Sequence, residues 1–85
     1  MATATPGPTP NPNAMRFALD VTLPGTISAS KPDDAGGDQF LAAVMAIDGV
    51  ASVFGTSDFV TVNRKPGGDW DAIVPAVQEA AASYL

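Results

Sequence analysis

The first third of the chain contains two predicted β-strands. In the segment 14–20 the apolar side chains Met15, Phe17 and Leu19 fall on one face of an extended chain, while small or polar residues fall on the other. This alternation is typical of a strand with one buried face. The segment 26–29 follows a proline- and glycine-containing turn and predicts a short second strand.

A β-hairpin is predicted in the middle of the chain. The segments 50–54 and 59–63 flank a four-residue turn of glycine, threonine, serine and aspartate. In its second strand Val60 and Val62 share one face and Phe59 lies on the other. If the valines face the core, Phe59 faces outward, and an exposed aromatic ring on an open sheet face is typical of a docking surface. The inverse assignment of the two faces stays open and would bury Phe59.

A first helix is predicted between the two pairs of strands. Asp38 stands where a helix N-cap is expected, because its carboxylate can accept hydrogen bonds from free backbone N–H groups. Apolar residues then recur at helical spacing, and Gly49 marks the end because glycine readily adopts the left-handed conformation there.

A second helix is predicted up to Tyr84, beginning at either Asp69 or Asp71. Pro75 lies inside it and removes a backbone hydrogen bond, at a smaller cost if Asp71 is the cap. Both starting points stay open. Trp70, at the beginning of this helix, is explained equally by packing in the core and by an interface.

The element order is therefore strand, strand, helix, strand, strand, helix. Strands and helices with one apolar face each predict an α+β two-layer sandwich, order ββαββα, with a mainly antiparallel sheet and both helices on one face. Residues 1–8, rich in proline, threonine and alanine, are expected to form a flexible leader. Residues 9–85 are expected to form one domain.

Composition excludes several classes of function. The 85 residues contain no cysteine and no histidine, so the chain offers no disulfide, thiolate nucleophile, histidine base or cysteine-ligated metal cluster. The net charge of −5 disfavours nucleic-acid binding, which needs a basic surface. The longest apolar run has eight residues, at 40–47, too few to span a membrane. We expect a cytoplasmic protein.

The remaining candidates for chemistry are clustered carboxylates. Asp33, Asp34 and Asp38 could offer oxygen ligands to a hard cation, but their spacing fits no calcium-loop pattern. Asp69 and Asp71 lie where a helix start favours acidic residues in any case. Solvated caps explain both groups, so we expect no enzyme activity, no cofactor and no bound metal.

Several short motifs, in the same order along the chain, resemble the N-terminal domain of Nfu/NifU-like iron–sulfur scaffold proteins. They are TPNPN at 9–13 followed by MRF at 15–17, IDGV at 47–50, VF at 53–54 with DFVTV at 58–62, and Trp70 with Pro75. The likeness runs from Thr9 to the C-terminus. It implies a compact α+β domain associated with iron–sulfur cluster assembly or delivery.

The chain also departs from that family. Arg16 stands where the family commonly has lysine, and the loop 25–37 has few matching residues. Full-length members carry a second domain whose Cys-x-x-Cys pair binds the cluster, and the chain has no cysteine. The scaffold activity therefore does not carry over.

We expect a stand-alone, monomeric module that recognises an iron–sulfur scaffold, carrier or acceptor protein, without contacting nucleic acid or membrane. The expected recognition residues are a shaped proline–asparagine surface, two polar contacts and one apolar anchor: Pro10, Asn11, Pro12, Asn13, Arg16, Asp58 and Phe59. The alternative is an adaptor domain of the same fold with no role in iron–sulfur metabolism.

Overall fold

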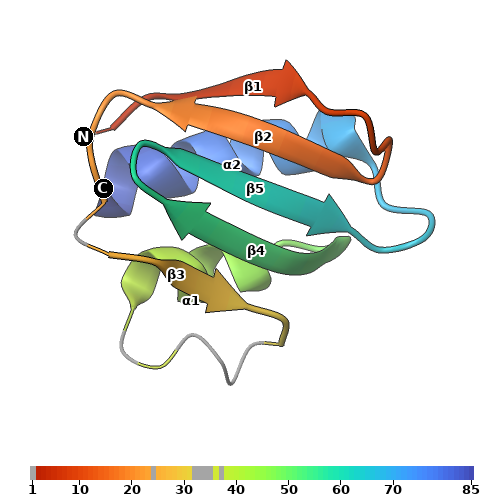
Figure 1. Ribbon diagram of the computed structural model, residues 1–85. Helices are drawn as coiled ribbons and strands as arrows, with labels where there is room; N and C mark the ends of the chain where they lie inside the picture. Colours follow the sequence, from red (N-terminus) through yellow and green to blue (C-terminus); the bar gives the residue numbers. More distant parts are fainter. Residues whose placement is uncertain (1, 24, 32–35, 37) are drawn as a thin grey trace.

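The computed structural model describes residues 2–23, 25–31, 36 and 38–85. Within them, five strands form one sheet and two helices cover one of its faces (Figure 1), which confirms the predicted α+β class. In chain order the elements are β1 (Ala4–Pro8), β2 (Ala14–Leu19), β3 (Ile27–Ala29), α1 (Gln39–Met45), β4 (Val50–Thr56), β5 (Phe59–Arg64) and α2 (Trp70–Tyr84).

The sheet has the strand order β1-β2-β5-β4-β3, and every neighbouring pair is antiparallel. The two strands with the clearest apolar alternation, β2 and β5, pair in its interior, where Met15 faces Val62 and Phe17 faces Val60. The inward side chains of both strands therefore contribute to the same core.

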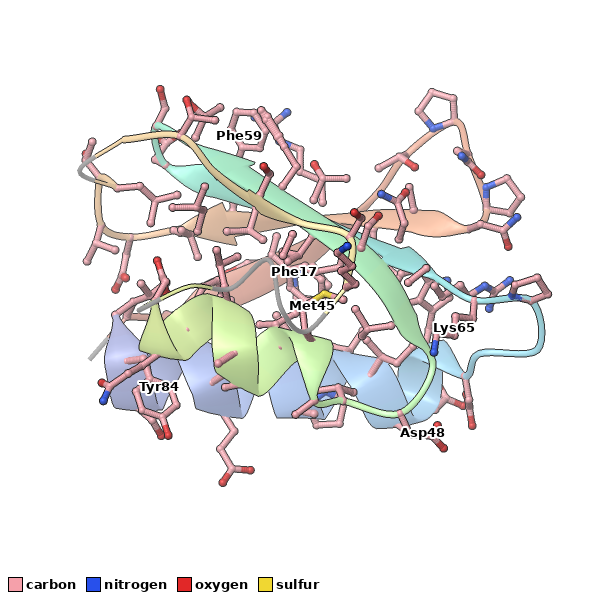
Figure 2. The ribbon with its side chains drawn as sticks, turned by 90° about the horizontal axis from the view of Figure 1, so that it is seen from below. Phe17, Met45, Asp48, Phe59, Lys65 and Tyr84 are labelled. Atoms are coloured by element: carbon pink, nitrogen blue, oxygen red, sulfur yellow. The ribbon has the colours of Figure 1, made fainter. Side chains whose placement is uncertain are left out.

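The core lies between the sheet and the helices. Phe17, Val60 and Val62 on the sheet and Val44 and Ile73 on the helices are fully buried. Figure 2 shows Phe17 and Met45 between the two layers and Phe59 on the opposite side of the sheet. The face of the sheet that carries Phe59 is not covered by either helix.

Residues 4–8, which we expected within a flexible leader, form the edge strand β1 and pair with β2. The prolines are compatible with this position. The carbonyl of Ala4 accepts a hydrogen bond from Gln78 Nε2 of α2 at 3.1 Å, so its backbone points away from β2. Residues two apart on a strand direct their backbone groups to the same side, so Pro6 and Pro8 also face away from β2. Their missing N–H groups therefore cost no hydrogen bond to β2. The element order is therefore βββαββα.

The helix caps show where the two helices begin, including the start of α2 that the sequence left open between Asp69 and Asp71. Asp38 caps α1, its Oδ1 accepting from Leu41 N at 3.0 Å, as predicted. Asp69 caps α2, its Oδ1 accepting from Asp71 N at 2.9 Å, so Pro75 lies inside that helix at an exposed position. The helix α1 ends at Met45, before the predicted stop at Gly49.

The central hairpin is tighter than predicted. The strand β4 continues through Thr56, so the turn comprises Ser57 and Asp58 and not the four residues from Gly55 onward. Ser57 adopts a φ of 54°, a left-handed conformation that allows the short reversal. Gly55 is a strand residue, paired with Ile27 and Val60, and a side chain there would press on Leu23, Ile27 and Val60.

Candidate functional site

Residues 10–13, here called the Pro-Asn turn, are all exposed and held by hydrogen bonds within the segment. The N–H of Asn13 donates to Oδ1 of Asn11 at 2.9 Å. The hydroxyl of Thr9 accepts from Asn11 N at 3.2 Å and donates to the carbonyl of Ala14 at 2.9 Å. Short polar side chains that bond the nearby backbone in this way fix a turn.

Two residues distant in sequence fasten the Pro-Asn turn to the rest of the fold. The indole Nε1 of Trp70 donates to the carbonyl of Pro12 at 3.1 Å. The guanidinium of Arg64 donates from Nε to Asn13 Oδ1 at 3.2 Å and from Nη1 to the carbonyl of Gly68 at 3.2 Å. It also lies 5.5 Å from the centroid of the Trp70 ring. The turn is therefore a fixed shape.

These contacts assign Asn11 and Asn13 a structural role that the sequence did not reveal. The oxygen atoms of both side chains accept hydrogen bonds from within the protein. The rings of Pro10 and Pro12 are exposed to solvent. Trp70 is half-buried, and its indole N–H donates to the carbonyl of Pro12. This contact accounts for the position of Trp70, which the sequence had left between core packing and an interface.

The second group of predicted residues lies on the uncovered side of the sheet. The open face is defined here by the outward strand positions at its centre: Arg16, Ala18, Phe54, Thr56, Phe59 and Thr61. Because Val60 and Val62 are fully buried, Phe59 lies on the open face, as the first of the two assignments predicted. The guanidinium of Arg16 stacks 4.2 Å from the centroid of the Phe59 ring.

Phe54 is an open-face residue that the sequence analysis did not single out. It lies on β4 directly opposite Thr61 and is 38% exposed. The signal was present, because Val53 is buried and its neighbour in an extended strand must point the other way. The turn predicted from Gly55 onward ended the strand at Phe54, so the outward direction of this side chain was not recognised.

Asp58 does not join the Pro-Asn turn. It lies in the turn between β4 and β5, where its carbonyl accepts from Leu19 N at 2.7 Å. Asp58 therefore lies near Leu19 at one end of β2, whereas the Pro-Asn turn adjoins Ala14 at the other end. The predicted residues are thus spread over the Pro-Asn turn, the open face and the β4–β5 turn.

The acidic side chains of the described residues lie away from the open face. Among the described residues, no carboxylate occupies an outward strand position, and Arg16 is the charged group at its centre. The described carboxylates lie in or beside the helices, or at the end of the sheet near the β4–β5 turn: Asp38, Asp48, Asp69, Asp71 and Glu79, and Asp20 and Asp58.

The carboxylate cluster considered for a cation lies mostly outside the described residues. Asp33 and Asp34 lie outside the described residues, and the third member, Asp38, caps α1. Across the described residues, no group of three or more His, Cys, Asp or Glu side chains is placed to hold a metal ion. In the same part of the chain, neither helix has the length and apolar character needed to cross a bilayer.

Comparisons with known proteins agree with the fold and its boundaries. The family described as scaffold protein Nfu/NifU N terminal matches residues 5–85, which includes most of β1. The chain is 40% identical over 75 residues to the Bacillus subtilis protein YpgR and 32% identical over 74 residues to conserved virulence factor C of Staphylococcus aureus. Each match covers 86% of this chain but 20% of the relative's length.

Two solved structures share the architecture. The crystal structure of Staphylococcus aureus protein SAV1430 has a TM-score of 0.79 at 26% identity, covering 92% of this chain and 96% of the other. The solution structure of a NifU-like protein from Saccharomyces cerevisiae has a TM-score of 0.75 at 22% identity, covering 98% of this chain and 76% of the other. The second likeness shows the fold alone.

Proposed function

Because this chain belongs to the Nfu/NifU N-terminal family, we propose that it is a protein-recognition domain in iron–sulfur cluster assembly or delivery. In this proposal the domain binds a scaffold, a carrier or an acceptor protein, and the cluster is held elsewhere. The 85 residues contain no cysteine and no histidine, the side chains that ligate iron in such clusters. Because these residues offer no such ligand for a cluster, recognition of another protein is the role that we propose.

The observation that carries the proposal is the uncovered face of the sheet. One face buries the core under two helices, whereas the other carries the exposed Phe54, the half-buried Phe59 and the exposed Arg16 stacked on it. Aromatic and arginine side chains are the residue types most enriched where proteins bind one another. The rigid Pro-Asn turn adds a second shaped surface at one end of the sheet.

The experiment is capture of defined iron–sulfur proteins by the immobilised domain under anaerobic conditions. The probes are a purified cysteine-bearing scaffold and an apo-acceptor enzyme from the same organism, each with and without cluster. We expect saturable binding of at least one of them. Binding of neither, together with capture of proteins that hold no cluster, would support the adaptor alternative and contradict the iron–sulfur role.

The double variant Asn11→Ala with Asn13→Ala tests the contribution of the Pro-Asn turn. We expect partner affinity to fall about tenfold, while the free energy of unfolding falls by about 1–2 kcal/mol because the lost hydrogen bonds are solvent-exposed. The matched control is Gln78→Ala, which removes a side-chain amide on α2 that donates a hydrogen bond to the carbonyl of Ala4. Unchanged affinity in a folded double variant would remove the Pro-Asn turn from the binding surface.

A further inference from the structure

The centre of the open face combines one positive charge with apolar surface. Arg16 on β2 and Phe54 on β4 both lie directly opposite Thr61 of β5, so the three side chains form a row across the strands. Two interstrand spacings separate the ends of this row, which is about 10 Å. Both end residues are exposed.

Stacking on Phe59 holds the Arg16 guanidinium in place. With its carbon 4.2 Å from the ring centroid, one planar side of the guanidinium is covered by Phe59. Its N–H edge remains able to donate two parallel hydrogen bonds to a carboxylate. No ion pair joins Arg16 to another described residue, so this capacity is unused within the described fold.

The charge distribution limits what can occupy the open face. A nucleic acid is disfavoured because the net charge is −5 and the open face offers one arginine. A second copy of this chain is disfavoured because pairing two open faces brings together two Arg16 side chains without a carboxylate from the described strands. A highly acidic partner is repelled by the carboxylates elsewhere on the molecule.

We propose that the open face docks a mainly apolar segment of a partner protein that carries one carboxylate, which pairs with Arg16, and one large apolar side chain, which packs on Phe54. Side chains two residues apart share one face of an extended peptide and are about 7 Å apart. The Arg16 guanidinium lies over Phe59 of β5, the strand between β2 and β4, so this shorter distance suffices to reach Phe54. The inference rests on the recognition part of the proposed function. It does not depend on whether the partner belongs to iron–sulfur metabolism.

The probe is a library of random twelve-residue peptides, selected on the immobilised full chain. We expect enriched peptides to contain a single Asp or Glu and a large apolar residue two positions away. A representative enriched peptide is then synthesised, and its affinity is measured by fluorescence polarisation for the original chain and its variants. Its binding position is mapped by amide chemical shifts.

The variants separate the open face from the rest of the surface. Arg16→Glu should weaken binding at least tenfold, Arg16→Lys should restore part of it, and Phe54→Thr should weaken it about fivefold. Lys65→Glu is the control for charge, because it makes the same change in net charge at an exposed loop position. Tyr84→Ser is the control for an exposed aromatic residue, at 50% exposure on α2. Both controls should bind within twofold of the original chain.

Four results would overturn the proposal. Two concern the selection: the absence of any enriched peptide, and enrichment without the acidic and apolar pair. Two concern the variants: equal loss in Arg16→Glu and Lys65→Glu, and unchanged affinity in folded Phe54→Thr. Failure to bind a scaffold or acceptor protein, with these peptide results intact, would count against the iron–sulfur role alone.

Discussion

The two faces of the β2–β5 pair are built from neighbouring residues but follow different requirements. Facing the helices, Phe17 and Val60 lie opposite each other and are fully buried. On the other face, Ala18 and Phe59 lie opposite each other and remain exposed or half-buried. Burial of the first face accounts for most of the stability, whereas the aromatic ring of Phe59 on the second face adds only partial burial and a contact with Arg16. The open face is therefore where function is expected.

The difference between the buried face and the open face is tested most severely by removing one phenylalanine ring from each. Phe17→Ala should lower the free energy of unfolding by about 3–5 kcal/mol, because it leaves a cavity in the core. That loss is comparable with the whole stability of a small domain. Chemical denaturation followed by circular dichroism measures it.

Phe59→Ala is the matched variant on the open face. It should cost about 1 kcal/mol, from partial burial and the lost contact with Arg16. Similar losses in the two variants would show that the open face is a second core surface, and would weaken its assignment to binding.

A smaller effect is expected where α2 meets the Pro-Asn turn. Trp70→Phe keeps an aromatic ring but removes the N–H that donates to the carbonyl of Pro12. We expect a loss of about 0.5–1.5 kcal/mol in the free energy of unfolding, because one hydrogen bond is lost at an exposed site. Amide hydrogen exchange should rise at Asn13 and Ala14 while that of β4 stays unchanged. Faster exchange throughout the sheet would contradict a local role for Trp70.

The smallest effect on stability is expected at Phe54. Phe54→Thr should change the free energy of unfolding by about 0.5 kcal/mol or less, because threonine suits an exposed strand position. Thermal unfolding measures this change. A larger loss would mean that Phe54 supports the fold, and its reduced peptide binding would then need no separate explanation.

Much of the fold was predictable because local patterns and global packing agree. The alternation of Met15, Phe17 and Leu19 identified β2, and the valines of β5 correctly indicated the inward face. The capping aspartate Asp38 correctly marked the start of α1. These signals lie within a few residues of the structure that they specify.

The errors came from features that depend on distant residues. The prolines of β1 suggested an unstructured leader, but they lie on the outer edge of the sheet, where no N–H is needed. The turn after β4 was predicted too long because glycine is common in turns. In the fold Gly55 is a strand residue, and its lack of a side chain leaves room for Leu23 and Ile27.

The candidate site was harder to predict than the fold. The outward direction of Phe59 was correctly predicted from strand alternation, but the exposed Phe54 and the contacts that hold the Pro-Asn turn were not predicted. Arg64 and Trp70 reach that turn from positions more than fifty residues away. Only pairing between strands and the packing of α2 bring them there.

The most direct test of recognition through the open face is amide chemical-shift mapping. The isotope-labelled chain is titrated with a purified cysteine-bearing iron–sulfur scaffold protein from the same organism. The account predicts that the largest shifts fall on Arg16, Phe54, Phe59 and Thr61, with α1 and α2 unaffected. Shifts centred on the helices, with the open face unchanged, would contradict it.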